Sequence, residues 1–414
     1  MFLERNVIMR RYTFFSRLRH VSILHTTLLS MGLFDEIVSG FSTIGLPLFR
    51  EQLGLSYAQI GLIFTVSALF GMVLEPLLNL LSDRGSKRYW ILGGLLVFIL
   101  SFVLRASTHS FVLLLLAFVL SYPAGDAAIG LSQAVLIELA PTRATQVMAR
   151  WTFLSSIGDF LAPLIVVAIV SVHLGWAGLC WIATSMSIVA AIIVSSHRFP
   201  KPLATISSEE TTSLKTLLAG LREALQDPIL LRWSLLTVIP TMVDEVFLVF
   251  TALYLRDVVH ASLEAVGIVI AIHTAGALLG LFVLDRFLLR WNTPRQLLIW
   301  LSLVVLVGML CLLSFHQLWI VTLALFIIGL GASSWYPIAK GQAYGRFPGR
   351  VGTVRAVISL FAALDVALPG FVSIVVDHFG LIAGLGFLGS APVLMLSLLV
   401  GTRDNKREHS QNSL

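Results

Sequence analysis

Seven acidic residues interrupt long apolar stretches of this sequence, and a carboxyl group in such a setting can carry a proton. Two octapeptides show the pattern, since SIGDFLAP carries Asp159 before Pro163 and AALDVALP carries Asp365 before Pro369. The full set comprises Asp35, Glu36, Asp126, Asp159, Asp244, Glu245 and Asp365. A carboxyl group that alternates between wet and dry surroundings gains and loses a proton, because burial disfavours the charged form. These residues are therefore candidates for transport and proton coupling.

Each acid also has a structural interpretation. It can brace a helix by hydrogen-bonding to a neighbouring segment. Asp159 and Asp365 are each followed four residues later by a proline, which bends the helix by removing a backbone donor. Successive helical residues point about 100° apart, so the two acids of an adjacent pair do not both face one cavity. Within the pairs Asp35-Glu36 and Asp244-Glu245 we favour inward-facing aspartates. Function is favoured for the whole set, and both interpretations stay open for any single acid.

Membrane-spanning helices are the elements that must position these acids. Of the 414 residues, 57% are apolar and 12% are charged, whereas soluble domains carry about 25% charged residues. Segments of about 20 apolar residues, long enough to cross a bilayer, recur along the chain. The predicted spans are 21–49, 57–81, 90–106, 109–138, 150–172, 175–196, 229–255, 262–284, 297–314, 317–345, 352–376 and 380–400. The sequence thus predicts an all-α membrane protein with twelve transmembrane helices.

A polar stretch in the middle divides the predicted spans into two groups of six. The predicted parts are an N-terminal tail 1–20, a bundle 21–196, a linker 197–228, a second bundle 229–400 and a C-terminal tail 401–414. With both termini inside, lysine and arginine fall overwhelmingly on the inner side of this arrangement, as in most membrane proteins. We therefore expect a multi-pass protein of the cell membrane with both termini, and the linker, in the cytoplasm.

Matching features recur about half the chain length apart. The acidic pairs at Asp35 and Asp244 are separated by 209 residues, the Asp-Arg pairs at Asp83 and Asp285 by 202, and SQAVLIELAP and GQAYGRFP by 209. The aspartates at Asp159 and Asp365 are separated by 206 residues. Four matches in the same order at nearly one spacing indicate two pseudo-symmetric six-helix halves.

With this repeat, the chain resembles the major facilitator superfamily of secondary transporters over nearly its whole length. The family signature after helix two reads roughly G-x-x-x-D-R-x-G-R-R, and NLLSDRGSKR supplies its Asp-Arg pair and two later basic residues. It departs from the signature at Asn79 and Ser86. The resemblance implies paired six-helix bundles with a site near the membrane midplane.

The resemblance also implies a cytoplasmic gate in which the loop aspartate engages a neighbouring helix and basic partners. The gate residues would be Asp83, Arg84, Lys87, Arg88, Asp285 and Arg286, with Arg143 and Arg346 as candidate partners. A solvated positive loop is the alternative, although it explains the repeated Asp-Arg pair less well.

Two further patterns bear on the transporter type. GDFLAP gives a partial match to the G-x-x-x-G-P element of antiporters, and the helix-four arginine of drug/proton antiporters is replaced by Asp126 in SYPAGDAAIG. The stretch FREQLGLSYAQIGLIFTVSALFGMVLEPL is similar to exporters of the fosmidomycin-resistance type.

Some residues in the spans have simpler explanations. Arg150 and Arg355 are expected to be interfacial side chains that extend to the membrane surface. Lys340 is either a lysine at the cytoplasmic end of its span, which we favour, or a partner for an acid or an anionic substrate. The candidate substrate-lining residues are Phe41, Trp335, Tyr336 and Lys340.

The sequence favours proton-coupled export of a small organic molecule by alternating access. Proton-coupled uptake of a sugar-like or anionic nutrient is the alternative, and a membrane enzyme or receptor on the same scaffold is a third. No catalytic motif, phosphate-binding glycine loop or metal-ligand spacing is found, and Cys180 and Cys311 lie in apolar runs. The expected partners are a small-molecule substrate, protons and the lipid bilayer. We expect a monomer without cofactor, metal or nucleic acid.

Overall fold

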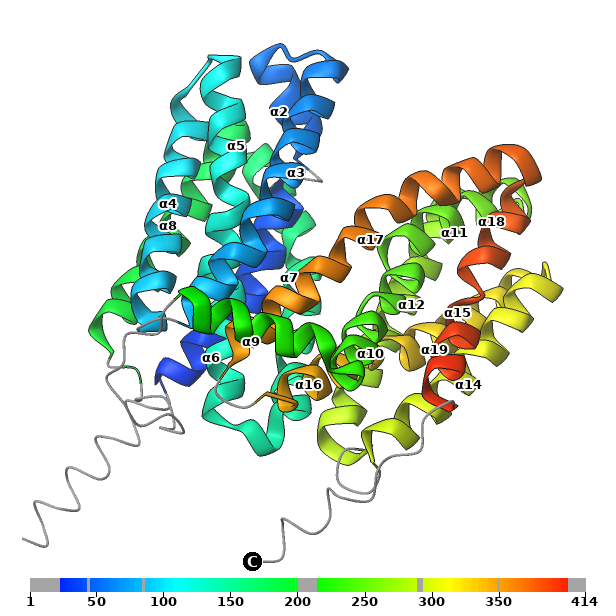
Figure 1. The fold of residues 1–414 in the computed structure, drawn as a ribbon. Helices are drawn as coiled ribbons and strands as arrows, with labels where there is room; N and C mark the ends of the chain where they lie inside the picture. Colours follow the sequence, from blue (N-terminus) through cyan, green and yellow to red (C-terminus); the bar gives the residue numbers. More distant parts are fainter. Residues whose placement is uncertain are drawn as a thin grey trace, which may run out of the picture. The chain divides into compact units, whose positions relative to one another are not determined.

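The computed structural model describes residues 23–42, 45–83, 86–197, 199, 214–288, 293–347 and 350–400, and every regular element among them is helical (Figure 1). Ten helical stretches in these residues are long and apolar enough to cross a bilayer. The other two predicted spans correspond to a helix over residues 23–42 and to helix α17, Val351–Phe379, which contains two shorter apolar stretches. The prediction of an all-α chain with twelve membrane spans is confirmed.

The chain divides into two compact units, and α17 contributes to both. Unit 1 combines Met1–Asp227 with Tyr344–Leu360, and unit 2 combines Pro228–Ala343 with Phe361–Leu414. The beginning of α17 therefore belongs to unit 1, although its sequence lies in the second half of the chain. The bundle boundaries expected from the repeat, 21–196 and 229–400, stay a prediction.

Unit 1 holds the helical elements that precede Pro228. They are α2 (Leu46–Leu53), α3 (Tyr57–Ser82), α4 (Lys87–Ser107), α5 (Phe111–Gly125), η1 (Asp126–Gly130), α6 (Leu131–Leu139), η2 (Pro141–Arg143), α7 (Ala144–Ser171), α8 (Gly175–Ser196) and α9 (Leu214–Gln226). Within this unit α4 packs against both α5 and α8.

Unit 2 holds most of the remaining elements. They are α10 (Pro228–Leu236), η3 (Ile239–Val243), α11 (Glu245–Asp257), α12 (Leu263–Val283), η4 (Leu284–Leu288), α14 (Pro294–Ser314), α15 (Leu318–Ala332), α16 (Trp335–Gly345), α18 (Leu381–Leu388) and α19 (Ala391–Val400). Here α15 packs against both α12 and α14.

Side-chain caps fix where some spans begin. At the start of α3 the Ser56 hydroxyl accepts the Gln59 N–H at 3.2 Å, and the Gln59 side chain accepts the Ser56 N–H at 2.9 Å. Thr293 and Gln296 form the same reciprocal cap on α14, which has a proline in its first turn. Each cap satisfies two backbone donors that an α-helix leaves unpaired. These helices therefore start at defined residues rather than fraying into the loops.

Irregular turns interrupt two spans next to predicted acids. The π-helical turn η1 begins at Asp126, and the 3-10 turn η3 ends one residue before Asp244. Hydroxyl groups bind carbonyls around η3, since Thr237 donates to Ser234 O and Thr241 donates to Val238 O, each at 2.6 Å. Turns of these kinds inside helices often mark functional sites. They also rotate the following residues away from the positions that a regular helix would give them.

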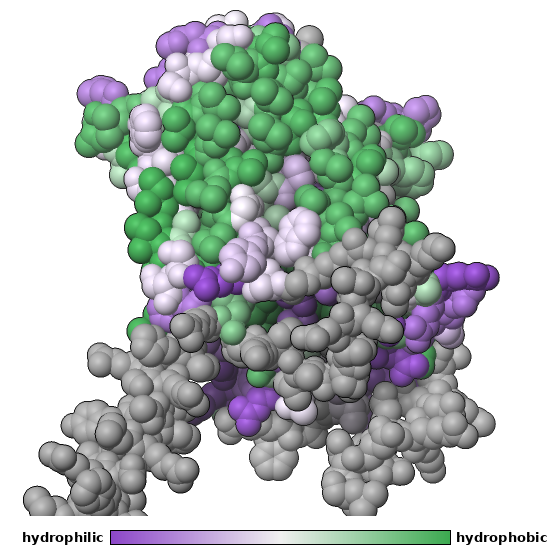
Figure 2. Space-filling view, turned by 60° about the vertical axis from the view of Figure 1, so that its left-hand side comes forward, coloured by the Kyte–Doolittle hydropathy of each residue, from purple (hydrophilic) through white to green (hydrophobic). Residues whose placement is uncertain are grey.

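A large apolar surface faces outward on unit 1. The face in Figure 2 presents hydrophobic side chains side by side, with hydrophilic ones gathered at its margins. Exposed large apolar residues on α4, α5 and α8 include Leu96, Leu100, Val112, Leu116 and Ile192. Water would disfavour such a surface, whereas bilayer hydrocarbon matches it.

Candidate functional site

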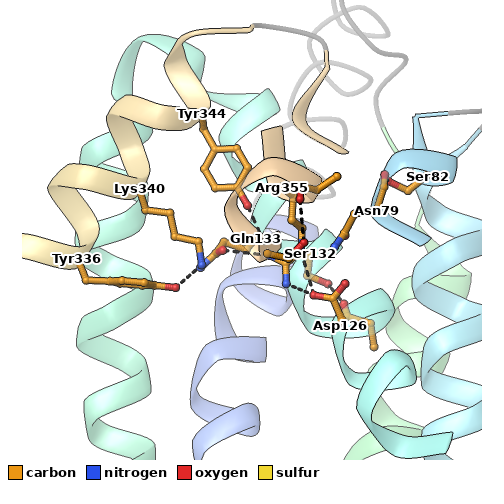
Figure 3. Close-up of polar contacts among 12 residues, drawn as sticks. Asn79, Ser82, Asp126, Ser132, Gln133, Tyr336, Lys340, Tyr344 and Arg355 are labelled. Atoms are coloured by element: carbon orange, nitrogen blue, oxygen red, sulfur yellow. Dashed lines mark hydrogen bonds and ion pairs between the residues drawn. The ribbon is translucent and has the colours of Figure 1, made fainter. Parts of the chain in front are cut away.

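An ion pair between Arg355 and Asp126 forms the centre of a polar cluster inside unit 1 (Figure 3). Arg355 lies in the second turn of α17, and Asp126 is the first residue of η1. The Arg355 guanidinium donates to Asp126 Oδ1 from Nε at 3.0 Å and also from Nη2. The side chains are only 16% and 7% exposed, respectively. Both charges are thus largely removed from water and depend on each other.

Neutral polar groups complete the surroundings of this pair. The Nη1 atom of Arg355 lies 3.5 Å from both Gln133 Oε1 and the Tyr344 hydroxyl. Gln133 and Tyr344 are 3% and 1% exposed, so these contacts supply partners that water does not. Asp126 Oδ2 is buried and has no hydrogen-bond partner among the described residues. The cluster therefore satisfies more of the hydrogen-bonding capacity of the arginine than of the aspartate.

Gly130 makes room for the arginine. A Cβ atom built on this residue would overlap the Arg355 guanidinium. The π-helical turn brings both Asp126 and Gly130 to the guanidinium, the first as charge partner and the second as a gap in the helix surface. Only glycine leaves space for this approach, because any other residue carries a Cβ atom.

The expectation that Arg355 extends to the membrane surface is wrong. α17 begins at Val351, and the Arg355 side chain pairs with Asp126 of η1, with 16% of its surface exposed. The sequence does not indicate this pairing, because the partner lies 229 positions away. Gln133 lies in the repeated segment SQAVLIELAP, and nothing in its local sequence indicates an arginine contact.

Asp83 caps the N-terminus of α17. Its carboxylate accepts the backbone N–H groups of Gly352 at 2.9 Å and Thr353 at 2.8 Å, and also the Thr353 hydroxyl at 2.8 Å. A negative charge here also complements the positive end of the helix dipole. A Cβ atom on Gly352 would overlap the Asn79 carbonyl oxygen, so glycine allows the two helices this close approach. Asp83 thus joins the end of α3 to the start of α17.

The basic residues after Asp83 take other partners. Lys87 forms an ion pair with Glu138, and its ammonium nitrogen also lies 3.8 Å from Asp83 Oδ1. Arg88 donates a hydrogen bond to the Ser195 carbonyl. Arg84, also predicted for the gate, lies outside the described residues. Lys87 therefore links the Asp83 cap to α6.

The arginines expected as partners of Asp83 have other surroundings. Arg346 bonds to Asp227 at 2.7 Å, and Arg143 is exposed. Arg350 pairs with Glu223 of α9 at 3.0 Å. Leu221 of α9 packs on the buried Leu80 and Ala356. The backbone of α17, rather than these arginines, provides the main contacts of Asp83.

The remaining predicted acids occupy different surroundings. Asp35, Glu36 and Asp365 are half-buried, whereas Asp159 and Asp244 are exposed. The side chain of Glu245 lies outside the described part. Asp365 contacts the Thr241 hydroxyl at 3.0 Å within unit 2. In the second Asp-Arg pair, Asp285 is half-buried in η4 and Arg286 is exposed.

The candidate substrate-lining residues are mostly inaccessible. Phe41 and Trp335 are 1% and 0% exposed, so in this structure they pack in the protein interior. Lys340 is 8% exposed and contacts the Tyr336 hydroxyl, with its ammonium 4.6 Å from the centre of that ring. The placement of Lys340 at the cytoplasmic end of its span stays a prediction. Within the described residues, no group of three His, Cys, Asp or Glu residues is placed to hold a metal ion.

Known proteins resemble this chain in sequence and in fold. A family model described as "Major Facilitator Superfamily" matches residues 28–364. The "Quinolone resistance protein NorA" of Staphylococcus aureus (strain COL) is 24% identical over 297 residues, which cover 69% of this chain and 72% of that protein.

Two solved transporter structures have a similar backbone. The major facilitator transporter FucP in the outward conformation gives a TM-score of 0.71 at 15% identity, covering 92% of this chain and 99% of that chain. The proton:xylose symporter XylE gives a TM-score of 0.68 at 15% identity, covering 92% of this chain and 94% of that chain. At these identities the likeness concerns the fold.

Proposed function

The chain belongs to the Major Facilitator Superfamily, and we propose that it exports a small organic molecule in exchange for protons. As a member of this family it is a multi-pass membrane transporter rather than an enzyme. The proposal concerns the coupling ion, the direction and the kind of substrate. Its mechanism is alternating access, in which the substrate site opens to one side of the membrane at a time.

The buried pair of Arg355 and Asp126 is the observation that carries the proposal. Ionisable residues inside membrane spans are expensive and in most cases functional. Burying two charges costs several kcal/mol per ion, which only a well-bonded pair recovers. A hydrophobic packing contact would hold η1 and α17 together without this cost. We therefore assign the charges a role in transport.

Export is supported by the relative named for quinolone resistance, because resistance to a drug is what removal of that drug provides. Uptake in the same direction as protons is the second candidate. It is favoured by the likeness in fold to a proton:xylose symporter. The acids inside the spans serve either direction, so the substrate and the sign of coupling must be measured.

Transport by the purified chain in lipid vesicles tests the proposal. A pH gradient is imposed, and the flux of a panel of small molecules, including a fluorescent quinolone, is followed. We expect substrate to move against the proton flow. Movement with the proton flow would support uptake instead, and a flux that ignores the gradient would refute proton coupling.

A matched pair of variants links the flux to the site. Asp126→Asn should reduce gradient-driven flux by about tenfold or more, because it leaves the Arg355 charge without its counter-charge. Asp377→Asn makes the same chemical change on the exposed far part of α17 and should leave the flux near the wild-type level. Equal fluxes in the two variants would contradict the role assigned to Asp126.

A further inference from the structure

Helix α9 connects two membrane spans, one formed by α8 and one that begins with α10. One face of α9 packs on the rest of unit 1. On this face Leu221 contacts the buried Leu80 and Ala356, and Ala224 is fully buried. The remaining surface of α9 has an acidic side and an apolar side, and the two have different surroundings.

The acidic residues of α9 and of the position that follows it are paired with arginines of unit 1. Glu223 accepts a hydrogen bond from Arg350 at 3.0 Å, and Asp227, the residue after the helix, accepts one from Arg346 at 2.7 Å. A Cβ atom built on Gly220 would also lie 3.5 Å from an Arg350 nitrogen, so this arginine runs along the same side of the helix. Both carboxylates thus have a counter-charge, and neither opposes the approach of an anion to α9.

The apolar side of α9 is exposed and carries a free positive charge. Leu218 and Leu225 are 50% and 39% exposed, and Arg222 between them is exposed as well. These three residues follow each other at spacings of four and three, so they lie on one side of the helix. Arg222 forms no ion pair with another residue that the structure describes. The exposed edge of α9 therefore consists of two leucines around an arginine.

The neighbours of α9 place this edge at the level of the membrane surface. Leu80, against which α9 packs, lies two residues before the end of the membrane span α3. α9 itself ends at Gln226, and the next span begins at Pro228. In Figure 1 α9 runs crosswise to α3, α4 and α8 of the same unit. Since those helices cross the bilayer, α9 lies along the membrane plane.

We propose that α9 is an interfacial helix that binds anionic phospholipids. In this arrangement Arg222 contacts a headgroup phosphate, and Leu218 and Leu225 enter the boundary between headgroups and acyl chains. Amphipathic helices bind this boundary through buried apolar surface together with the attraction of basic residues to anionic lipids. The proposal concerns the membrane surface, so it does not depend on the direction of transport or on the coupling ion.

Charge and position favour lipid over a second copy of the chain as the occupant of this edge. A basic residue near an anionic membrane surface strengthens binding by about fivefold. In an interface between two copies, the same arginine would be buried in a protein contact and would need a carboxylate there. The acids of α9 do not provide one, because Glu223 and Asp227 already pair with arginines of unit 1. Membrane lipid, in contrast, already surrounds the spans on either side of α9.

Spin-label accessibility in lipid nanodiscs tests where the edge lies. A nitroxide is attached at Leu225→Cys or, as the control, at the exposed Gln226→Cys, in the full-length protein with Cys180→Ala and Cys311→Ala. The two labels point about 100° apart. With phosphatidylglycerol present, we expect oxygen, which concentrates in the bilayer, to reach the Leu225 label and a water-soluble nickel complex to reach the Gln226 label. Equal access of the nickel complex to both labels would overturn the proposal. Shielding of the Leu225 label from both reagents would indicate a protein contact and would also contradict it.

Native mass spectrometry tests the choice of lipid with both cysteines in place. Phosphatidylglycerol or phosphatidylcholine is titrated into the full-length protein in detergent, and the dissociation constant of the first bound lipid is measured. Arg222→Gln should weaken phosphatidylglycerol binding by about fivefold and leave phosphatidylcholine binding unchanged. Arg143→Gln removes an exposed arginine outside α9 and should change neither constant. The same loss in both variants, or no loss in Arg222→Gln, would contradict the role assigned to Arg222.

Discussion

At the scale of single residues, the burial of Arg355 and Asp126 makes each charge depend on the other. The pair is nearly enclosed, and its remaining contacts are to the neutral Gln133 and Tyr344. A buried pair is a weak source of net stability, but an unpaired buried charge is strongly destabilising. The pair is therefore best characterised by the coupling free energy between its two members, rather than by its net contribution to stability.

A double-mutant cycle measures this coupling. Asp126→Asn and Arg355→Gln should each destabilise the protein by about 3–5 kcal/mol, because each leaves one buried charge without its counter-charge. The double variant should lose less than the sum of the two, since contacting residues are not additive. Thermal unfolding of the four proteins in detergent gives the comparison. Additive losses would show that the two charges do not depend on each other.

Gly130 is the second residue on which this pair depends. Gly130→Ala places a methyl group on the guanidinium, and overpacking of this kind costs about 1–3 kcal/mol. Gly93→Ala on α4 is the matched control, because nothing lies within 4 Å of its added Cβ atom. We expect the thermal midpoint to fall for Gly130→Ala and to stay or rise slightly for Gly93→Ala. Equal midpoints would mean that Arg355 can move away from Gly130 at no cost.

At the scale of elements, the start of α17 is held by a carboxylate from another helix. Asp83 accepts two backbone donors of the first turn of α17, which a helix cannot satisfy by itself. Its loop position makes this an inter-helix cap rather than a local one. The cap and the Arg355 pair lie on the part of α17 that belongs to unit 1, so the same segment is held at two points.

Neutralising Asp83 should loosen this end of α17. Asp83→Asn weakens the bonds to Gly352 and Thr353 and removes the favourable charge at the helix dipole, at a cost of about 1–2 kcal/mol. Hydrogen-exchange mass spectrometry should show faster exchange in the peptide that begins α17. Ser86→Ala is the control, because Ser86 flanks α4 without a side-chain cap. Unchanged exchange in Asp83→Asn would contradict the capping role.

At the scale of the whole molecule, hydropathy and the repeat predicted far more of the fold than of the site. The spans follow from the length of the apolar segments, and the Asp83 loop is visible as a short motif. The Arg355 pair was not predictable, because it depends on the rotation of α17 and on a π-helical turn at Asp126. Hydropathy is averaged over all faces of a helix, so it does not show which face of α17 is turned toward η1.

The same limit applies to the acids. Their apolar surroundings identified Asp126 and Asp365 as unusual, but their partners Arg355 and Thr241 came only from three-dimensional contacts. In the sequence Thr241 is one threonine among many in apolar spans, and only the turn η3 places its hydroxyl next to Asp365. Sequence alone therefore selects the candidate acids without distinguishing their roles.

Proton movement driven by substrate is the measurement that tests the central claim most directly. Vesicles containing the protein and a pH-sensitive dye receive a substrate gradient and no pH gradient. We predict that protons move opposite to the substrate, so that the luminal pH rises as substrate enters the vesicles, and that an ionophore for protons abolishes the signal. Substrate that crosses the membrane while the luminal pH stays constant would contradict it.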